Sequence, residues 1–478
     1  MRIWILLSAG LSVIAARATH ASPSFEITQV VTPAFVQAGV EFPLSVYAKN
    51  SSKDKADISV RCSDKQGGLL CSGSAAAAPG ETVPVRMNAS CSKNGLDSLN
   101  VDLTARGSKD SKSVVLPVVA KKLYFAWFST GKPEDKALKY ANVLLAHTSE
   151  TRDYWRERGV THCVWKGGNN EIASMKSGSE YAAYLLKDVR ESGSKGILID
   201  EIGGYDWDLQ SHKIAENGIP GLMEFNKKNP DLFLGVWVSG SVRPPLLMAA
   251  KNIYRTEGVD LLMMETYVNC FEGAFNTHSR WSYFDQRINM AREFDVLDHC
   301  VLTLETNGPA EKPKATASEI EDQIRYVRRT APEMPGVGFF VFTPDALETN
   351  LAADRFCYKY WILPVVTCWD RDMTFSNPDP AAGEIVKIYG TVNNIGGMDA
   401  KNIKVAFYDG HPSAGGRLIG KSVVITKLAT DEGCPKGARK VSVDWKATSG
   451  FHDIYMAIYA SREVTVLDGL ARKTIGVR

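Results

Sequence analysis

The sequence predicts a multidomain protein of mixed α/β and all-β class, in which a TIM-like (β/α)7-8 barrel is flanked by N- and C-terminal immunoglobulin-like β-sandwiches. The 478 residues are enough for roughly three domains. Residues 122–362 alternate short apolar runs with amphipathic helical stretches, which is typical of parallel βα units. Residues 22–121 and 363–478 instead alternate apolar and polar residues between turn clusters, which is typical of sandwiches.

The first 21 residues predict a signal peptide. Arg2 supplies a positive start, and the apolar run from Ile3 to Ala16 is too short to span a membrane. Small-residue cleavage sites follow at Ala18 and Ala21. We therefore expect a secreted, periplasmic or cell-surface protein, without a membrane span in the mature chain. The alternative is that this segment is a membrane anchor.

The chain contains nine cysteines, which suits export to an oxidising compartment. We expect some of them to form disulfide bonds, although their spacing does not define the pairing. The odd number leaves at least one thiol free or bonded to another chain. No pair of cysteines has a zinc-binding spacing such as C-x-x-C, and the histidines are isolated, so we expect no metal and no cofactor.

Residues 22–121 predict the N-terminal β-sandwich. Phe42–Ala48 and Leu99–Thr104 alternate apolar and polar side chains, and turn clusters such as Lys49–Ser52 separate these runs. Alternation of this kind is typical of antiparallel strands with one buried face and one solvated face.

Residues 122–362 predict the barrel. Amphipathic helices separate the strands, among them a long helix over 134–158 and a helix with a capping box from Ser318 to Glu321. An eighth strand lies in the segment after Phe128, or the barrel is incomplete. The alternative is a doubly wound sheet, which the absence of a GxGxxG or P-loop pattern disfavours. Seven strands are expected, at 123–128, 163–165, 196–201, 234–238, 261–265, 301–305 and 337–342.

Residues 363–478 predict the C-terminal β-sandwich. A cleanly alternating stretch over 384–397 follows a glycine and ends in an Asn-Asn-x-Gly turn. A Val-Ala-Phe-Tyr strand over 405–408 and a Val-Asp-Trp-Lys segment over 443–446 come next. Together these features resemble the bacterial cell-adhesion-related (CARDB) sandwich domains. The resemblance covers about the last quarter of the chain and implies an accessory domain without chemistry of its own.

Carboxylates close three of the predicted barrel strands. Asp200 and Glu201 end one strand, Glu265 ends another and Glu305 ends a third. In a parallel barrel the carboxyl ends of all strands meet at one rim, so we expect these side chains to gather there. Strand alternation points only one of Asp200 and Glu201 directly inward.

Gathered carboxylates predict acid–base chemistry. Like charges at one site push their pKa values apart, which provides a proton donor beside a base or nucleophile. Cleavage of a glycosidic bond needs such a pair. The alternative is that each carboxylate is paired with a neighbouring loop or a basic side chain such as Arg243.

Aromatic and amide side chains lie at or just after the same strand ends. Flat rings stack on sugar faces, and amides bind hydroxyl groups. Taken singly, each tryptophan is better explained by packing within the barrel. Taken together, they favour a sugar site, and we assign seven candidate substrate-binding residues: Trp127, Trp165, Tyr205, Trp237, Tyr267, Asn307 and Asp345.

The barrel region resembles the glycoside hydrolases. The adjacent Asp200-Glu201 looks like the substrate-assisted hexosaminidases, in which the glutamate is the acid and the aspartate orients the substrate's acetamido group. Met263–Tyr267 is similar to the Met-x-Tyr strand of chitinase-like barrels. The sequence lacks the chitinase D-x-x-D-x-D-x-E run, so the resemblance implies the class of activity only.

We therefore expect a secreted glycosidase acting on a polysaccharide or glycan. Glu201 would be the general acid, Asp200 would orient or stabilise, and Glu265 or Glu305 would serve as base or nucleophile. The competing interpretation is a non-catalytic carbohydrate-binding or cell-surface adhesion protein on a barrel scaffold. A formal net charge of +2 with scattered basic residues argues against a nucleic-acid partner. A lyase or deacetylase would need a metal or a neutralising base, which the sequence does not indicate.

Overall fold

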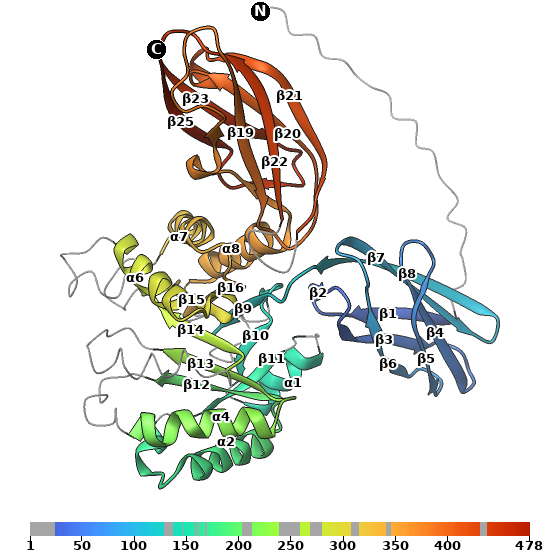
Figure 1. Cartoon of the computed structure of the whole chain (residues 1–478). Helices are drawn as coiled ribbons and strands as arrows, with labels where there is room; N and C mark the ends of the chain where they lie inside the picture. Colours follow the sequence, from blue (N-terminus) through green and yellow to red (C-terminus); the bar gives the residue numbers. More distant parts are fainter. Residues whose placement is uncertain are drawn as a thin grey trace, which may run out of the picture.

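The computed structural model has a central barrel with pairs of β-sheets on its N- and C-terminal sides (Figure 1). The structure describes residues 24–128, 137–146, 148–157, 160, 162–167, 170–202, 213–238, 259–267, 280–306, 315–340, 346–430 and 437–478. The predicted signal peptide, residues 1–21, lies outside these ranges. Among the helices within them, none has the length and apolarity needed to cross a bilayer. The predicted α/β barrel flanked by all-β regions is confirmed.

The N-terminal part consists of two sheets that share an apolar core, and their strands pair antiparallel except for β2 and β8, which are parallel. One sheet has the order β1-β3-β6, and the other contains β2, β8, β7, β4 and β5. Alternate side chains of β3, β4, β6 and β7, such as Val46 of β3 and Val60 of β4, are buried between the sheets. The strands are β1 Phe25–Val31, β2 Val36–Gln37, β3 Glu41–Asn50, β4 Ala56–Ser63, β5 Leu69–Ala77, β6 Thr82–Ser90, β7 Gly95–Ala105 and β8 Ser108–Val119.

The central part is a closed barrel of parallel strands that run around it in chain order. The ring closes between β16 and β9, where Gly336 faces Tyr124 and Phe339 faces Trp127. Eight strands form the ring, so the barrel is complete. They are β9 Tyr124–Trp127, β10 Val143–Ala146, β11 His162–Gly167, β12 Gly196–Ile202, β13 Phe233–Val238, β14 Leu261–Glu265, β15 Cys300–Glu305 and β16 Gly336–Phe340.

The prediction of one long helix over 134–158 is wrong, because this segment contains the barrel strand β10. Within that segment the structure has β10 and then α1, Ser149–Glu157. A four-residue apolar run cannot be told from one turn of a buried helix by its pattern. Asn142 fixes the start of β10, because its side chain accepts a hydrogen bond from the N–H of Phe125 and donates one to the carbonyl of Leu123, both at 2.7 Å.

Helices cover the outside of the barrel, and local signals set their ends. Ser177 caps α2 through the N–H of Glu180, and Gly193 ends it with a φ of 63°. The capping box of α7 is formed by Thr316 and Glu319, two residues before the predicted box. The helices are α2 Gly178–Ser192, α4 Ile219–Lys228, α6 Arg280–Glu293, α7 Ala317–Thr330 and α8 Leu347–Cys357, which continues into the π-helix η6, Tyr358–Ile362.

The C-terminal part again consists of two sheets. One contains β18, β19, β17 and β24, with β22 paired to β19, and the other has the order β21-β20-β23-β25. Their inner faces enclose a second apolar core around Val405 and Ile454. The strands are β17 Val365–Thr367, β18 Thr374–Phe375, β19 Ile385–Asn394, β20 Ala400–Asp409, β21 Arg417–Leu428, β22 Ala438–Lys446, β23 Gly450–Tyr459, β24 Thr465–Val466 and β25 Leu470–Val477.

The expected disulfide bonds are not supported in the described part of the chain. Cys62 and Cys71 face each other across the β4–β5 ladder. A hydrogen bond between the two thiols, together with burial, raises the pKa of Cys62, so the protonated thiol is favoured there. The free cysteines are Cys62, Cys71, Cys91, Cys300, Cys357 and Cys368.

Candidate functional site at the carboxyl rim of the barrel

Two apolar clusters define the inner and outer faces of the barrel strands. One cluster is enclosed by the strands, and the other is shared with the surrounding helices. Successive side chains of a strand point to opposite faces. The inner residues of the three strands that end in carboxylates are Leu198 in β12, Met263 in β14 and Val301 in β15.

The strand-end carboxylates follow the inner parity. Asp200 lies two residues after Leu198, Glu265 two residues after Met263, and Glu305 four residues after Val301. Glu265 and Glu305 therefore face the barrel axis at its carboxyl end, on the adjacent strands β14 and β15. For Asp200 the parity is interrupted by an irregularity in β12. The sequence predicts a site at this rim from the same strand-end positions.

Glu265 and Glu305 are enclosed by the surrounding protein. Their exposed fractions are 6% and 2%. The two strands that carry them are adjacent, with Glu265 opposite Thr303 in the ladder. Burying carboxylates is costly unless they are paired, hydrogen-bonded or used in chemistry. Two such groups on neighbouring strands therefore mark this end of the barrel as a candidate active site.

Asp200 and Glu201 lie at an irregularity in β12. From Ile199 to Ile202 the strand advances three residues, while its partner β13 advances two, from Val236 to Val238. This is a β-bulge, a feature that is common next to active sites because it redirects side chains. Asp200 is half-buried, and the side chain of Glu201 lies outside the described part of the structure.

Aromatic rings fill the same end of the barrel. Trp237 of β13 donates a hydrogen bond from Nε1 to the hydroxyl of Tyr267 at 2.9 Å, and both side chains are buried. Phe340 stacks on Tyr267 with ring centroids 5.0 Å apart, and Phe128 packs edge-on against Trp237. The rings form an apolar floor beside the carboxylates, and half-buried Phe128 and Phe340 form part of it.

Phe128 and Phe340 were missed as site residues by sequence reasoning. They stand at the ends of the first and last barrel strands, the same position that singles out Trp237 and Tyr267. Their position at the strand ends could have identified them. In the sequence, however, each residue only continues an apolar run and does not stand out from it.

Trp127 does not reach the rim. Its ring belongs to the outer cluster, packs on Phe339 at 4.4 Å and donates a hydrogen bond to Oδ1 of Asn350 in α8 at 3.0 Å. Thr306 donates to the same oxygen at 3.1 Å. This buried network joins α8 to the strand ends. Trp127 therefore packs between the barrel and α8 instead of facing a substrate. Of the other predicted residues, the side chain of Trp165 and the whole of Tyr205, Asn307 and Asp345 lie outside the described residues.

A buried hydroxyl lies beside the carboxylates. Thr303 shares the inner parity of β15 and sits between Glu265 of β14 and Gly338 of β16 in the ladder. It is fully buried, and its Oγ1 has no hydrogen-bond partner within the described part of the chain. A hydroxyl in this position can orient a carboxylate, a water molecule or a substrate hydroxyl.

The side chains at the rim are suited to proton transfer. Oxygen ligands are the groups that hard cations prefer, but within the described ranges no group of three or more His, Cys, Asp or Glu is arranged to hold a metal ion. Neighbouring carboxylates above an apolar aromatic floor can supply a proton donor and a base from the same type of side chain.

Comparisons with known proteins give only distant structural similarities. No family model and no curated protein matches the chain. A β-glucuronidase from Bacteroides uniformis is similar at 10% identity and a TM-score of 0.33, over 95% of this chain and 62% of that chain. The chain thus spans less than two thirds of that enzyme. A putative β-galactosidase from Bacteroides fragilis is similar at 10% identity and a TM-score of 0.33, over 95% of this chain and 75% of that chain. The active domain 2 of a chitinase from Pyrococcus furiosus is similar at 10% identity and a TM-score of 0.39, over 51% of this chain and 96% of that domain.

Proposed function

We propose that the protein hydrolyses glycosidic bonds of a polysaccharide or glycan at the carboxyl rim of its barrel. The observation that carries the proposal is the shared inner parity of Glu265 and Glu305, which directs two buried carboxylates from neighbouring strands toward one end of a closed parallel barrel, where β12 also ends in Asp200 and Glu201. The half-buried rings of Phe128 and Phe340, which pack on Trp237 and Tyr267, support it, because an apolar surface at the rim suits the face of a sugar ring.

In the proposed reaction, Glu201 donates a proton to the glycosidic oxygen as the bond to the leaving sugar breaks. Glu265 or Glu305 either attacks the anomeric carbon or takes a proton from the attacking water. Asp200 orients the substrate or stabilises the positive charge that develops on the ring. A carboxyl separation of about 5 Å would give retention of configuration, and about 6.5–9.5 Å would give inversion.

The test is a hydrolysis screen of the full chain on a panel of neutral and acidic polysaccharides, with reducing-end release as the readout. Replacing the general acid in Glu201→Gln should lower the rate by about 10²–10⁴-fold. Glu191→Gln is the matched control. Glu191 is exposed and lies at the C-terminal end of α2, which leads into the amino-terminal end of β12, away from the carboxyl rim. A Glu201→Gln variant that cleaves as well as the parent would remove Glu201 from the mechanism.

A carbohydrate-binding or adhesion protein without turnover is the second candidate. The hydrogen bond between the buried side chains of Trp237 and Tyr267 favours it, because polar groups that satisfy one another are not available for chemistry. Affinity electrophoresis on the same panel separates the two candidates. Retardation by a polysaccharide that the protein never cleaves would favour binding alone.

Export and an accessory role for the C-terminal sheets complete the proposal. Export rests on the signal-like residues 1–21, and the accessory role rests on the CARDB-like pattern over 384–446. Fractionation of expressing cells tests the first point: the processed chain should appear outside the cytoplasm, beginning near residue 22.

A further inference from the structure

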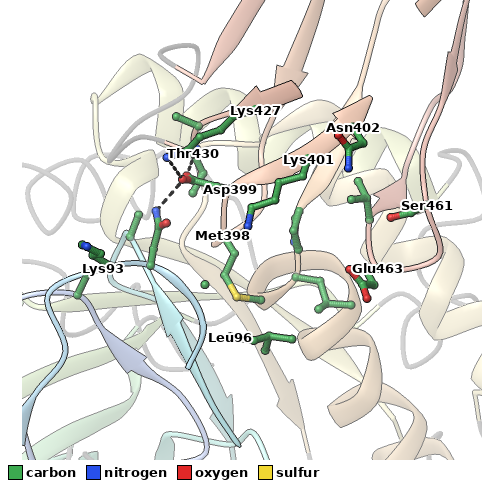
Figure 2. Close-up of a pocket in the computed structure, with 18 of the residues that line it drawn as sticks. Lys93, Leu96, Met398, Asp399, Lys401, Asn402, Lys427, Thr430, Ser461 and Glu463 are labelled. Carbon is green, nitrogen blue, oxygen red and sulfur yellow. Dashed lines mark hydrogen bonds and ion pairs between the residues drawn. The ribbon is translucent and has the colours of Figure 1, made fainter. Parts of the chain in front are cut away.

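A second concave site lies where the three parts of the molecule meet. It is a cleft of about 1290 Å³ lined by the β6–β7 connection, by residues after α8 and by β20 and β21 with their flanking turns. Ala120, which lines it, precedes β9, so the cleft is at the amino-terminal end of the barrel strands, opposite the carboxyl rim. Figure 2 shows Lys93 on the wall from the N-terminal sheets and Lys401 on the wall from the C-terminal sheets.

One carboxylate, that of Asp399, links the N-terminal and C-terminal walls of the cleft. Asp399 accepts hydrogen bonds from Nδ2 of Asn94 at 3.2 Å and from the N–H of Thr430 at 3.0 Å, and it forms an ion pair with Lys427 at 2.7 Å (Figure 2). Asn94 belongs to the N-terminal part, whereas the other partners belong to the C-terminal part. These bonds fix the two walls relative to each other and neutralise Asp399 with Lys427.

The remaining charge in the cleft is positive. Four lysines and two carboxylates line it, and the pairing of Asp399 with Lys427 leaves Lys65, Lys93 and Lys401 against Glu463. Within the described residues, no ion-pair partner is found for Lys93 or Lys401. Lysines on facing walls of one concave surface, where field lines are focused, favour an anionic ligand.

The other lining groups are suited to sugar. Ser92, Asn402 and Ser461 offer hydroxyl and amide groups between the lysines. Asn402 has a φ of 54°, a left-handed conformation that asparagine tolerates better than most residues. Leu96 lies in the cleft with 48% of its surface exposed, so an apolar patch is available for a ring face.

Other polyanions fit this surface less well. Single-stranded nucleic acid is bound through stacking on aromatic rings, and the described lining has only one, Tyr358, and no arginine. A lipid bilayer presents a flat surface, which does not follow the walls of a concave cleft. The chemistry of lysines interleaved with hydroxyls and amides matches a saccharide that carries negative charges.

We propose that this cleft binds an acidic oligosaccharide, with Lys93 and Lys401 contacting its carboxylate or sulfate groups from opposite walls. The proposal depends on the lining of the cleft and not on catalysis at the carboxyl rim, so either can fail without the other. It gives the protein a second saccharide contact, through which an acidic chain is held while the barrel rim remains free.

The test is a binding titration of the full chain with an oligogalacturonate, a sulfated oligosaccharide and a neutral oligosaccharide of equal length. We expect binding to at least one acidic probe, weakening as salt is raised, and a roughly tenfold or greater loss in the Lys93→Ala/Lys401→Ala double variant. Comparison of the two acidic probes identifies the charged group. The matched control is Lys421→Ala, an exposed lysine of β21 outside the cleft, which should leave binding unchanged.

The proposal would be overturned if neither acidic probe binds, or if the neutral probe binds equally well. Equal losses of binding in the double variant and in Lys421→Ala would also overturn it. A single-stranded oligonucleotide of the same charge is included, and stronger binding of the oligonucleotide would also contradict it. Charge reversal in Lys93→Glu/Lys401→Glu provides a second variant, in which the loss should exceed that of the alanine variant.

Discussion

Asp354 shows how one buried carboxylate fixes the backbone just before a strand begins. Its two oxygens accept hydrogen bonds from the N–H groups of Lys139 and Tyr140, at 2.9 and 2.8 Å, just before β10. Burial raises the pKa of this carboxyl to about 6, although the N–H bonds oppose the rise. Asp354 lies near the end of α8 at the amino-terminal end of the barrel, so it has a structural position, away from the carboxyl rim.

The Asp354→Asn variant is expected to be destabilised, because its NH₂ group would face one of the two backbone N–H groups that the carboxyl oxygens accept, and an NH₂ group cannot accept a hydrogen bond whereas a protonated carboxyl oxygen can. We expect a loss of about 1–3 kcal/mol in the free energy of unfolding at pH 4. The folded pKa lies above the unfolded value of 3.8, so the stability that Asp354 contributes is fully present below about pH 4 and is lost as the pH rises through 6. The difference between parent and variant should therefore shrink toward pH 7. Denaturant titrations of both proteins measure it, and a pH-independent difference would contradict this account.

The closure of the barrel depends on the close approach of β16 to β9. A Cβ atom on Gly336 would lie 1.7 Å from the carbonyl oxygen of Tyr124, which is a backbone atom of the facing strand. A Cβ on Gly235 of β13 would instead meet flexible side chains, with the nearest atoms of Phe233 and Met263 at 3.2 and 3.3 Å. The two glycines thus have different roles in strands of the same barrel.

Gly336→Ala should lower the free energy of unfolding by more than about 3 kcal/mol, because the closing strands must move apart. Gly235→Ala is the matched control and should cost about 1 kcal/mol or less. Thermal and denaturant unfolding of both variants provide the measurement. Equal losses of stability in the two variants would show that the close approach of β16 to β9 is not needed to close the barrel.

Most strands could be predicted because each is an apolar run bounded by turn residues. The four-residue β10 could not, since its strand conformation is imposed by ladders to β9 and β11 on either side. At the site, strand-end carboxylates such as Glu265 and Glu305 could be found from position alone. The outward direction of Trp127 could not be predicted. Alternation along a strand divides its side chains between two faces, but the sequence does not say which face is the inner one.

At the scale of the whole molecule, Arg328 joins the C-terminal sheets to the barrel. This fully buried side chain of α7 donates hydrogen bonds to the carbonyls of Pro332, at 2.9 Å, and Ile395, and it lies 4.9 Å from the ring of Trp361. Lys121, which follows the N-terminal sheets, also donates to the carbonyl of Ile395, at 3.0 Å. The turn after β19 is therefore a point at which all three parts are in contact.

Arg328→Met should weaken this junction, because it leaves buried carbonyls without their donor. We expect a loss of about 2–4 kcal/mol and a separate, lower-temperature transition in calorimetry as the C-terminal sheets come loose. Arg355→Met, which changes an exposed arginine of α8, is the control and should leave one transition at the parent temperature. A single unshifted transition in Arg328→Met would show that the junction is held elsewhere.

The central claim is that carboxylates from separate strands act together at the carboxyl rim. The most direct measurement is the hydrolysis rate, on a polysaccharide that the parent cleaves, of Glu265→Gln, Glu305→Gln and the double variant, each shown to be folded by its circular dichroism. The account predicts that at least one single variant loses about 10²-fold or more, and that the double variant is hardly slower than the worse single one, because groups that act as a unit are not additive. Parental rates in all three variants would contradict it.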